Sequence, residues 1–249
     1  MWGIILAGGD GTRLNPLTNV TNKHLLPIYD KPMVYYPLEF LINAGIKNII
    51  LVTGKEHAGS FADLLGDGSR FGVNITYKVQ EGALGIAHAL GITENVVKDE
   101  AVMAILGDNV FAVNPDEMER IKGLARDFNT KASGAAIFLK EVEDPERFGV
   151  PEFDGNKRIK IIEEKPKWPK SKYAVTGLYM YDRTVFDRIR TLKPSWRDEL
   201  EITDVNNAYL ADKKLEHHII NGEWTDAGTF ESLFRANSIA RNSRLKKRI

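Results

Sequence analysis

Short apolar runs alternate with segments of helical spacing through the first half of the chain. Four runs are typical of buried strands, and three segments between them have the spacing of amphipathic helices. The strands are expected at residues 4–6, 48–52, 75–79 and 102–106, and the helices at residues 33–43, 57–65 and 86–95. Strands that alternate with helices of this length form βαβ units. The pattern predicts an α/β fold with a Rossmann-like, mixed and mostly parallel sheet flanked by helices.

The second half of the chain has a less regular pattern. Asn114 and Pro115 form a helix start signal, because Asn caps helices and Pro is tolerated in the first turn. His217 and His218 adjoin on an expected strand, so they should face opposite ways and form no metal pair. No linker or repeat is visible, and we expect one domain over residues 1–249. Strands are expected at residues 135–139, 158–163 and 174–181, and helices at residues 117–128, 184–190, 202–211 and 230–242.

Composition narrows the functional classes. The 249 residues are 43% hydrophobic and 27% charged, which is ordinary for a globular protein. Lys and Arg (34) balance Asp and Glu (34), so no overall field favours nucleic acid or an anionic membrane. The chain has no cysteine, which excludes disulfides, thiolate metal sites and a cysteine nucleophile. No apolar stretch reaches transmembrane length and no basic leader is visible, so we expect a cytoplasmic protein without a membrane partner.

A glycine-rich loop follows the first expected strand. Residues 6–14 read Leu-Ala-Gly-Gly-Asp-Gly-Thr-Arg-Leu. Glycines let backbone N–H groups converge on an anion, and the end of a first strand is where α/β folds reach phosphates. Leu14 breaks the dinucleotide fingerprint, and Arg13 stands where a Walker loop needs Ser or Thr. The loop is thus either a phosphate cradle ending in an arginine or a turn without a ligand.

A second segment decides between these possibilities. Residues 22–33 read Asn-Lys-His-Leu-Leu-Pro-Ile-Tyr-Asp-Lys-Pro-Met, and together with the loop they resemble the signature of the sugar-1-phosphate nucleotidylyltransferases. Further matching motifs follow in order as far as about Asn237, and they resemble the thymidylyl branch of the family. These motifs lie at residues 107–109, 144–150, 162–166, 173–179, 199–204 and 224–229.

The resemblance implies a glycosyltransferase-A-like fold and a reaction. A deoxythymidylyl group would pass from dTTP to α-D-glucose 1-phosphate, and pyrophosphate would leave. The nucleotide would bind in about residues 1–110 and the sugar in about residues 111–249. Both reactants are anionic, so the site should need cations and a metal more than a general base.

Individual roles follow from the same resemblance, position by position. Arg13, Lys23 and Lys165 would be catalytic, and Asp108 and Asp226 would hold Mg²⁺, which prefers oxygen ligands. The nucleotide-binding residues would be Leu6, Gly8, Gly9, Gly11, Thr12, Gln80 and Gly85. The sugar-binding residues would be Asn109, Gly149, Glu164, Val175 and Tyr179.

Other observations qualify these roles. The carboxamide of Gln80 matches the imide edge shared by thymine and uracil. Leu84 stands where relatives often have Asp, so nucleotide preference is less defined. His24 stands where relatives often have Gln, and a packed or solvent-facing role is expected for it.

Several alternatives remain open. A UTP-preferring uridylyltransferase or another acceptor sugar would fit the same motifs. A non-catalytic regulatory subunit should have lost the charged residues expected at the site. This chain retains all five of them: Arg13, Lys23, Asp108, Lys165 and Asp226. A homo-oligomer is expected. Longer relatives continue through further C-terminal helices that help form a second, regulatory nucleotide site, so weaker or absent feedback through that site is also expected.

Overall fold

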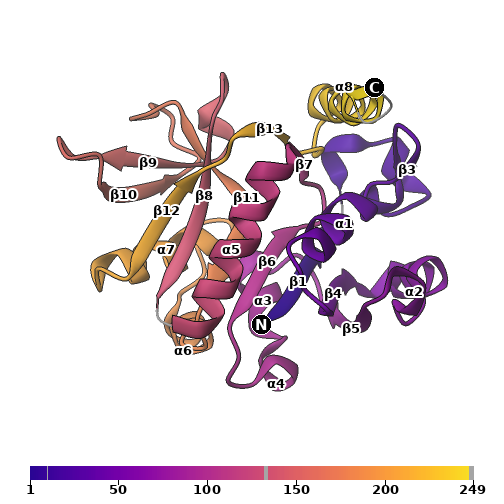
Figure 1. Cartoon of the computed structure of the whole chain (residues 1–249), viewed down its shortest axis with the longest axis horizontal. Helices are drawn as coiled ribbons and strands as arrows, with labels where there is room; N and C mark the ends of the chain where they lie inside the picture. The colour runs from indigo at the N-terminus through magenta and orange to yellow at the C-terminus, as the bar shows by residue number, and fades with distance from the viewer. Residues whose placement is uncertain (10, 132–133, 247–249) are drawn as a thin grey trace.

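A seven-stranded sheet forms the centre of the computed structural model, which describes residues 1–9, 11–131 and 134–246 (Figure 1). Its strand order is β12-β8-β11-β6-β1-β4-β5, and β11 runs antiparallel to both of its neighbours while the other pairs are parallel. The strands are β1 (Trp2–Ala7), β4 (Asn48–Gly54), β5 (Asn74–Gln80), β6 (Val102–Leu106), β8 (Ala135–Glu141), β11 (Tyr173–Tyr181) and β12 (Leu215–Ile219). The predicted mixed, mostly parallel sheet is therefore confirmed.

The described residues also form three two-stranded sheets and eight α-helices. The small sheets pair β2 (Pro27–Ile28) with β3 (Lys31–Pro32), β7 (Val110–Val113) with β13 (Gly222–Thr225), and β9 (Gly149–Phe153) with β10 (Ile159–Glu164). The helices are α1 (Tyr35–Asn43), α2 (Ala58–Leu65), α3 (Ile86–Gly91), α4 (Glu94–Val97), α5 (Pro115–Lys131), α6 (Val185–Thr191), α7 (Ile202–Ala211) and α8 (Phe230–Lys246). Short 3-10 turns lie at Thr12–Leu14, Leu17–Asn19, Lys23–Leu25, Lys55–His57, Ser69–Phe71 and Pro145–Arg147.

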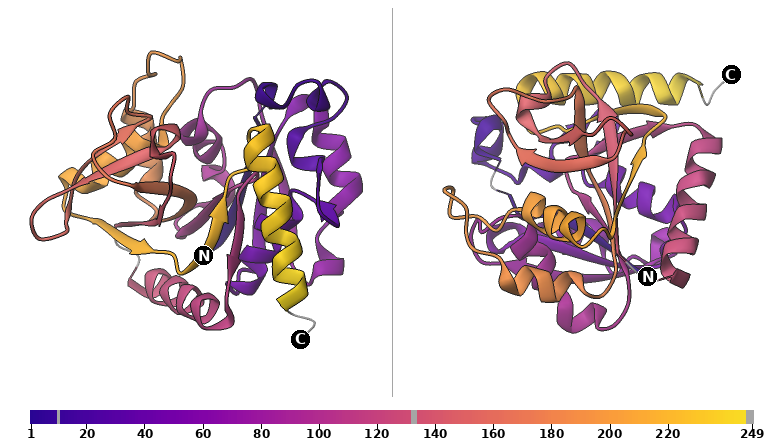
Figure 2. Two further views of the ribbon diagram at one scale, coloured as in Figure 1. Left: turned by 90° about the horizontal axis from the view of Figure 1, so that it is seen from above. Right: turned by 90° about the vertical axis from the view of Figure 1, so that its left-hand side faces the viewer.

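Two hydrophobic clusters cover the two faces of the central sheet. Alternate side chains of a strand point to opposite faces, so Ile4 joins the cluster under α3, α6 and α7, whereas Ile5 joins the cluster under α1, α2 and α5. A third cluster lies beneath α8, which contacts β2, β7 and β13. Figure 2 shows α8 along one side of the molecule. The β9–β10 pair projects from the body of the molecule in the same figure. Helices therefore cover both faces of the central sheet.

Most predicted elements are confirmed within two or three residues, and some are corrected. The helix expected at residues 86–95 is two helices, α3 and α4, separated by a turn in which the buried Thr93 hydroxyl donates to the Leu90 carbonyl at 2.6 Å. Asn114 does cap α5, because its side chain accepts from the Glu117 N–H at 2.8 Å. The strands β2, β3, β7, β9 and β13 were not predicted. No helix among the described residues is long and apolar enough to cross a membrane.

His217 and His218 face opposite sides of β12, as expected. The His217 ring lies 5.8 Å from the Phe153 ring, and the His218 ring lies 5.5 Å from the Phe138 ring. Phe138 and Phe153 belong to different clusters on the two faces of the sheet. The two histidines therefore pack separately, and they do not form a metal pair.

Candidate functional site

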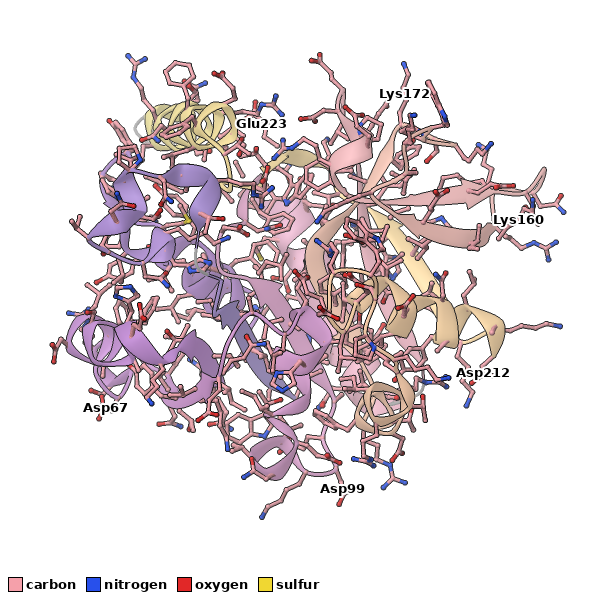
Figure 3. All side chains as sticks on the ribbon, turned by 180° about the vertical axis from the view of Figure 1, so that it is seen from behind. Asp67, Asp99, Lys160, Lys172, Asp212 and Glu223 are labelled. Atoms are coloured by element: carbon pink, nitrogen blue, oxygen red, sulfur yellow. The ribbon has the colours of Figure 1, made fainter. Side chains whose placement is uncertain are left out.

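A cavity of about 320 Å³ lies at the carboxyl ends of β1, β5 and β6. In open α/β sheets, ligands bind outside these ends. Figure 3 labels Asp67 at one edge of the molecule, and Lys160 and Lys172 on the opposite side. All predicted site residues except Gly11 and Thr12 line this cavity: Leu6, Gly8, Gly9, Arg13, Lys23, Gln80, Gly85, Asp108, Asn109, Gly149, Glu164, Lys165, Val175, Tyr179 and Asp226.

The glycine loop curls tightly over Lys23. A Cβ on Gly11, which has a φ of 69°, would lie 2.8 Å from the Lys23 Cβ, so only glycine fits there without displacement. A Cβ on Gly9 would meet the Lys23 Cε at 3.7 Å. Thr12 begins the 3-10 turn that contains Arg13 and is itself exposed. Gly11 and Thr12 thus shape the turn without lining the cavity, and Arg13 and Lys23 reach it.

Lys23 and Asp108 form a closely held ion pair. The Lys23 Nζ donates to the Asp108 Oδ2 at 2.5 Å, and both side chains are only 11% exposed. Burial by itself would raise the pKa of Asp108, but the Lys23 charge and its hydrogen bond outweigh burial, so this pKa is lowered. Asp108 is therefore ionised throughout the neutral range.

His24 is a packed residue, as expected. It is 2% exposed, and its Nδ1 lies 2.7 Å from the Asn22 Oδ1. Burial, together with the adjacent Lys23 charge, lowers the pKa of His24 to about 3. A Cβ on Gly107 would lie 2.7 Å from the His24 ring, so glycine is needed at this turn. The neutral imidazole supports the loop that presents Asp108.

Asp226 approaches Asp108 from the other side of the cavity. A Cβ placed on Gly228 would lie 3.0 Å from the Asp226 Oδ2, 3.1 Å from the Arg13 Nη2 and 3.5 Å from the Asp108 Oδ2. Burial, and next the Asp108 charge, raise the pKa of Asp226, although Arg147 opposes both. The Arg147 Nη2 donates to both Asp226 oxygens, at 3.0 and 2.8 Å. The two carboxylates therefore repel each other at a point that Arg13 also reaches.

This carboxylate pair has the chemistry of a magnesium site. Carboxylate oxygens are the protein ligands that Mg²⁺ prefers, and it usually keeps waters and substrate phosphates in its shell. A divalent cation would also remove the repulsion that raises the pKa of Asp226. Within residues 1–9, 11–131 and 134–246, no group of three or more His, Cys, Asp or Glu side chains could hold a metal ion. The donor set therefore fits a cation that is shared with a phosphate ligand.

Asn109 connects three elements at the floor of the cavity. Its Oδ1 accepts from the Gly177 N–H at 2.9 Å and from the Trp224 Nε1 at 2.7 Å, while its Nδ2 donates to the Asp108 Oδ1 at 3.0 Å. The side-chain oxygen is thus fully used, and only one N–H is left for a ligand. Asn109 therefore holds Asp108 in place from within the protein.

A second charged cluster occupies the far end of the cavity. Glu164 accepts from the Thr203 hydroxyl at 2.6 Å, and the Lys165 Nζ lies 3.7 Å from its other oxygen. Arg197 donates to both oxygens of Glu201, at 2.8 and 2.7 Å, and lies 3.8 Å from Glu164. A Cβ on Gly149 would lie 3.2 Å from the Thr203 hydroxyl, so glycine leaves the space above Glu164 open. This end offers two cations and an oriented carboxylate.

The backbone of Lys165 has an unusual conformation. Its φ is 46°, which non-glycine residues adopt at a cost, and its N–H donates to the Phe148 carbonyl at 3.0 Å. Pro166 follows directly. The strain turns the chain as β10 ends, so that Lys165 lines the cavity.

Two residues of β11 line the middle of the cavity. Val175 and Tyr179 are 7% and 3% exposed. Burial, with a smaller contribution from the Glu164 charge, raises the pKa of Tyr179 well above its usual value. The phenol therefore stays protonated throughout the neutral range.

The segment that contains Gln80 and Gly85 is tied to the opposite wall. Leu200 donates its N–H to the Leu84 carbonyl at 2.9 Å and accepts from the Ala87 N–H at 3.1 Å. Gly85, with a φ of 96°, sits against this backbone, and a Cβ there would lie 2.5 Å from the Leu200 carbonyl oxygen. Glycine at position 85 lets the first part of the chain meet the loop that presents Arg197.

Several residues that line the cavity were not singled out from the sequence, and three of them have side chains that bond within the site. Arg147 and Trp224 lie in motifs that carried the resemblance, and Arg197 lies just before one, but the type and spacing of these residues gave no sign of their partners. Arg147 bonds to Asp226, 79 residues away, and Trp224 bonds to Asn109, 115 residues away. Only the folded chain shows these pairings.

Comparisons with known proteins agree on one family. The nucleotidyl transferase family model matches residues 2–243. A glucose-1-phosphate thymidylyltransferase of Neisseria meningitidis is 48% identical over 96% of this chain and 82% of its own length. The Mycolicibacterium smegmatis enzyme of the same name is 46% identical over 99% of this chain and 84% of its own length. A crystal structure of a candidate glucose-1-phosphate thymidylyltransferase from Bacillus anthracis, in complex with sucrose, superposes with a TM-score of 0.90 at 50% identity, covering 97% of this chain and 96% of that one.

Proposed function

Because the chain belongs to the nucleotidyl transferase family, we propose that it transfers a deoxythymidylyl group from dTTP to α-D-glucose 1-phosphate and releases pyrophosphate. One observation supports this above the others. A single cavity brings Arg13 and Lys23 together with Lys165 and Arg197, so it holds two separate sets of cations. Two anionic substrates could lie there end to end.

The nucleotide would occupy the end near the glycine loop. Leu6, Gly8 and Gly9 would let the triphosphate lie against backbone N–H groups, with Gly11 and Thr12 shaping the turn. Arg13 and Lys23 would contact the phosphates, and Gln80 and Gly85 would contact the base. The carboxamide of Gln80 can read the imide edge that thymine and uracil share.

The sugar phosphate would occupy the other end. Lys165 would hold its phosphate, and Arg197 is a second cation within reach of the same region. Glu164 can accept from sugar hydroxyls, Tyr179 can donate, and Gly149 and Val175 would present backbone. Asn109 would contribute its one remaining N–H to the sugar.

Asp108 and Asp226 would hold Mg²⁺ at the nucleotide end of the cavity. The bound ion would neutralise charge on the phosphate oxygens as pyrophosphate leaves. Lys23, which pairs with Asp108, and Arg13, which approaches Asp226, would place further positive charge at the same point.

The reaction would be one in-line displacement. An oxygen of the sugar phosphate attacks the α-phosphorus, and the bond from that phosphorus to the pyrophosphate oxygen breaks. The nucleophile is already an oxyanion, so no side chain must remove a proton. Catalysis then consists of holding two anions in line and stabilising the charge of the leaving group.

A substrate grid tests this function. Pyrophosphate release is measured for dTTP, UTP, dCTP, ATP and GTP, each with glucose, galactose and mannose 1-phosphates and Mg²⁺. We expect dTTP with glucose 1-phosphate to give the highest kcat/KM. A higher value with UTP would make the protein a uridylyltransferase, and no turnover with any pair would favour a non-catalytic role.

The location and assembly of the protein are part of the proposal. Both substrates are cytoplasmic metabolites, which supports a cytoplasmic enzyme.

Phe230 and Phe234 are 49% and 73% exposed on α8, and exposed apolar side chains that lie together favour self-association. We expect a homo-oligomer, which light scattering after gel filtration measures.

Lys165→Met should separate acceptor binding from nucleotide binding. The substitution removes the cation while keeping most of the stem, so we expect KM for glucose 1-phosphate to rise about 10- to 100-fold, the scale of one charged hydrogen bond. KM for dTTP should change less than threefold. Steady-state kinetics with each substrate varied in turn make the comparison.

The matched control is Lys167→Met. Lys167 lies two residues further along, next to the exposed Trp168, and does not line the cavity. It should leave both KM values unchanged. Equal effects of Lys165→Met on both substrates would contradict the assignment.

A further inference from the structure

We propose that His88 is a positioning residue that fixes the orientation of the Gln80 side-chain amide, and that this orientation makes the site select a base with an N–H donor. The inference rests on the proposed function, and it concerns how that function distinguishes thymine from cytosine. His88 lies on α3 and does not line the cavity, so it can act only through another side chain.

The contacts of the Gln80 nitrogen determine which way the amide points. Nε2 lies 3.2 Å from the Gly85 carbonyl oxygen and 3.2 Å from the Nδ1 of His88. A carbonyl oxygen can only accept, so the atom facing Gly85 must be the amide nitrogen. That nitrogen only donates, so the His88 Nδ1 accepts and the imidazole proton lies on its Nε2. Both N–H groups of the Gln80 amide are then used inside the protein.

The oxygen of the same amide is left for the ligand. A Cβ placed on Gly8 would lie 2.6 Å from the Gln80 Oε1, and Gly8 lines the cavity. Gln80 is only 5% exposed, so little bulk water competes for this oxygen. The base therefore meets an acceptor. Thymine and uracil present an N–H at ring position 3, whereas cytosine presents a lone pair there, which the oxygen repels.

Without His88, the Gly85 carbonyl would hold the amide alone. The terminal torsion of a glutamine is broad and nearly two-fold, so a half-turn that exchanges oxygen and nitrogen costs little unless neighbours forbid it. The turned amide would present N–H groups to the cavity, which suit cytosine and oppose thymine. The Gly85 carbonyl and the His88 Nδ1 both accept from the Gln80 nitrogen. Together they make the preference for thymine over cytosine larger than either acceptor would alone.

Three substitutions test the inference. His88→Leu removes the acceptor, His88→Asn keeps an acceptor at the position of Nδ1, and His57→Leu is the matched control outside the cavity. Values of kcat and KM are measured for dTTP, dCTP and glucose 1-phosphate. We expect His88→Leu to lower the ratio of kcat/KM for dTTP to that for dCTP by about fivefold or more, the scale of one net hydrogen bond. KM for glucose 1-phosphate should stay within twofold of wild type.

The other variants distinguish orientation from packing. His88→Asn should restore the dTTP to dCTP ratio, and His57→Leu should not change it. His88→Met fills similar space without a nitrogen and replaces His88→Leu if that variant does not fold. An unchanged ratio in His88→Leu or His88→Met, or a ratio in His88→Asn as low as in His88→Leu, would overturn the inference. If wild-type protein itself does not prefer dTTP to dCTP, the proposed function is wrong, and the inference falls with it.

Discussion

Replacing Arg13 by alanine is expected to lower kcat by about two to three orders of magnitude, the effect of losing one preorganised donor at a developing charge. Arg13 lines the cavity close to Gly228, where Asp108 and Asp226 converge. Its guanidinium can make two parallel bonds to phosphate oxygens, which lysine cannot reproduce. The loss should fall on kcat more than on KM for dTTP, because the charge on pyrophosphate grows as the bond breaks. Single-turnover and steady-state rates measure it.

The fold should survive this change. The Arg13 side chain is exposed, and the neighbouring Leu14, which is fully buried, anchors the turn. Melting temperature should therefore match wild type closely. Arg183→Ala is the control, since Arg183 is an exposed arginine paired with Asp99 outside the cavity. A fall of less than tenfold in kcat for Arg13→Ala would show that this arginine does not contact the leaving phosphates.

Much of the central sheet could be predicted because its signal is local. Residues of β1, β4 and β6 are buried on both faces, so each strand is a continuous apolar run. The glycine loop could be located for a related reason, because a tight turn after a strand requires glycines at neighbouring positions. Asp108 comes two residues after the buried β6, so its position at the end of a strand could also be predicted. The chemistry of these positions was inferred from resemblance, and the cavity shows that the side chains do meet.

Several missing elements depend on partners that their own residues do not reveal. β7 and β13 are four residues each, and they pair across more than 100 residues, so neither has a pattern long enough to identify it. β9 begins at Gly149 and includes Pro151, two residues that argue against a strand in any local reading. It forms because β10 supplies the partner. The division of 86–95 into α3 and α4 likewise depends on a side-chain bond from Thr93, which propensity alone does not reveal.

The charged residues of the site show the same limit. Lys23 and Asp108 were both predicted, but their ion pair was not, and Arg147 and Arg197 were not assigned roles. Each buried carboxylate at the centre of the cavity has a cation of its own: Lys23 for Asp108 and Arg147 for Asp226. Such pairs keep the site folded without substrates, because an unpaired buried charge is costly. Binding of phosphates and metal would then exchange one set of ion pairs for another.

Asp226→Asn is expected to lower kcat by about 1000-fold at saturating Mg²⁺, because one of two proposed metal ligands loses its charge. The amide keeps an oxygen that can accept from Arg147 and from the Gly228 N–H, which donates to Asp226 at 3.2 Å. Local geometry should therefore be retained, and the melting temperature should change little. The affinity for Mn²⁺ in the presence of dTTP, followed by electron paramagnetic resonance, should fall together with kcat.

Asp144→Asn is the matched control for this change. Asp144 also accepts from Arg147, at 2.8 Å through Nη1, but it does not line the cavity. If Asp226 acts only by holding Arg147, the two variants should lose similar amounts of activity and leave Mn²⁺ affinity unchanged. If Asp226 holds the metal, only Asp226→Asn should weaken Mn²⁺ binding, and Asp144→Asn should keep most of the wild-type kcat. The contrast separates a metal ligand from a residue that merely positions an arginine, because Arg147 is common to both pairs.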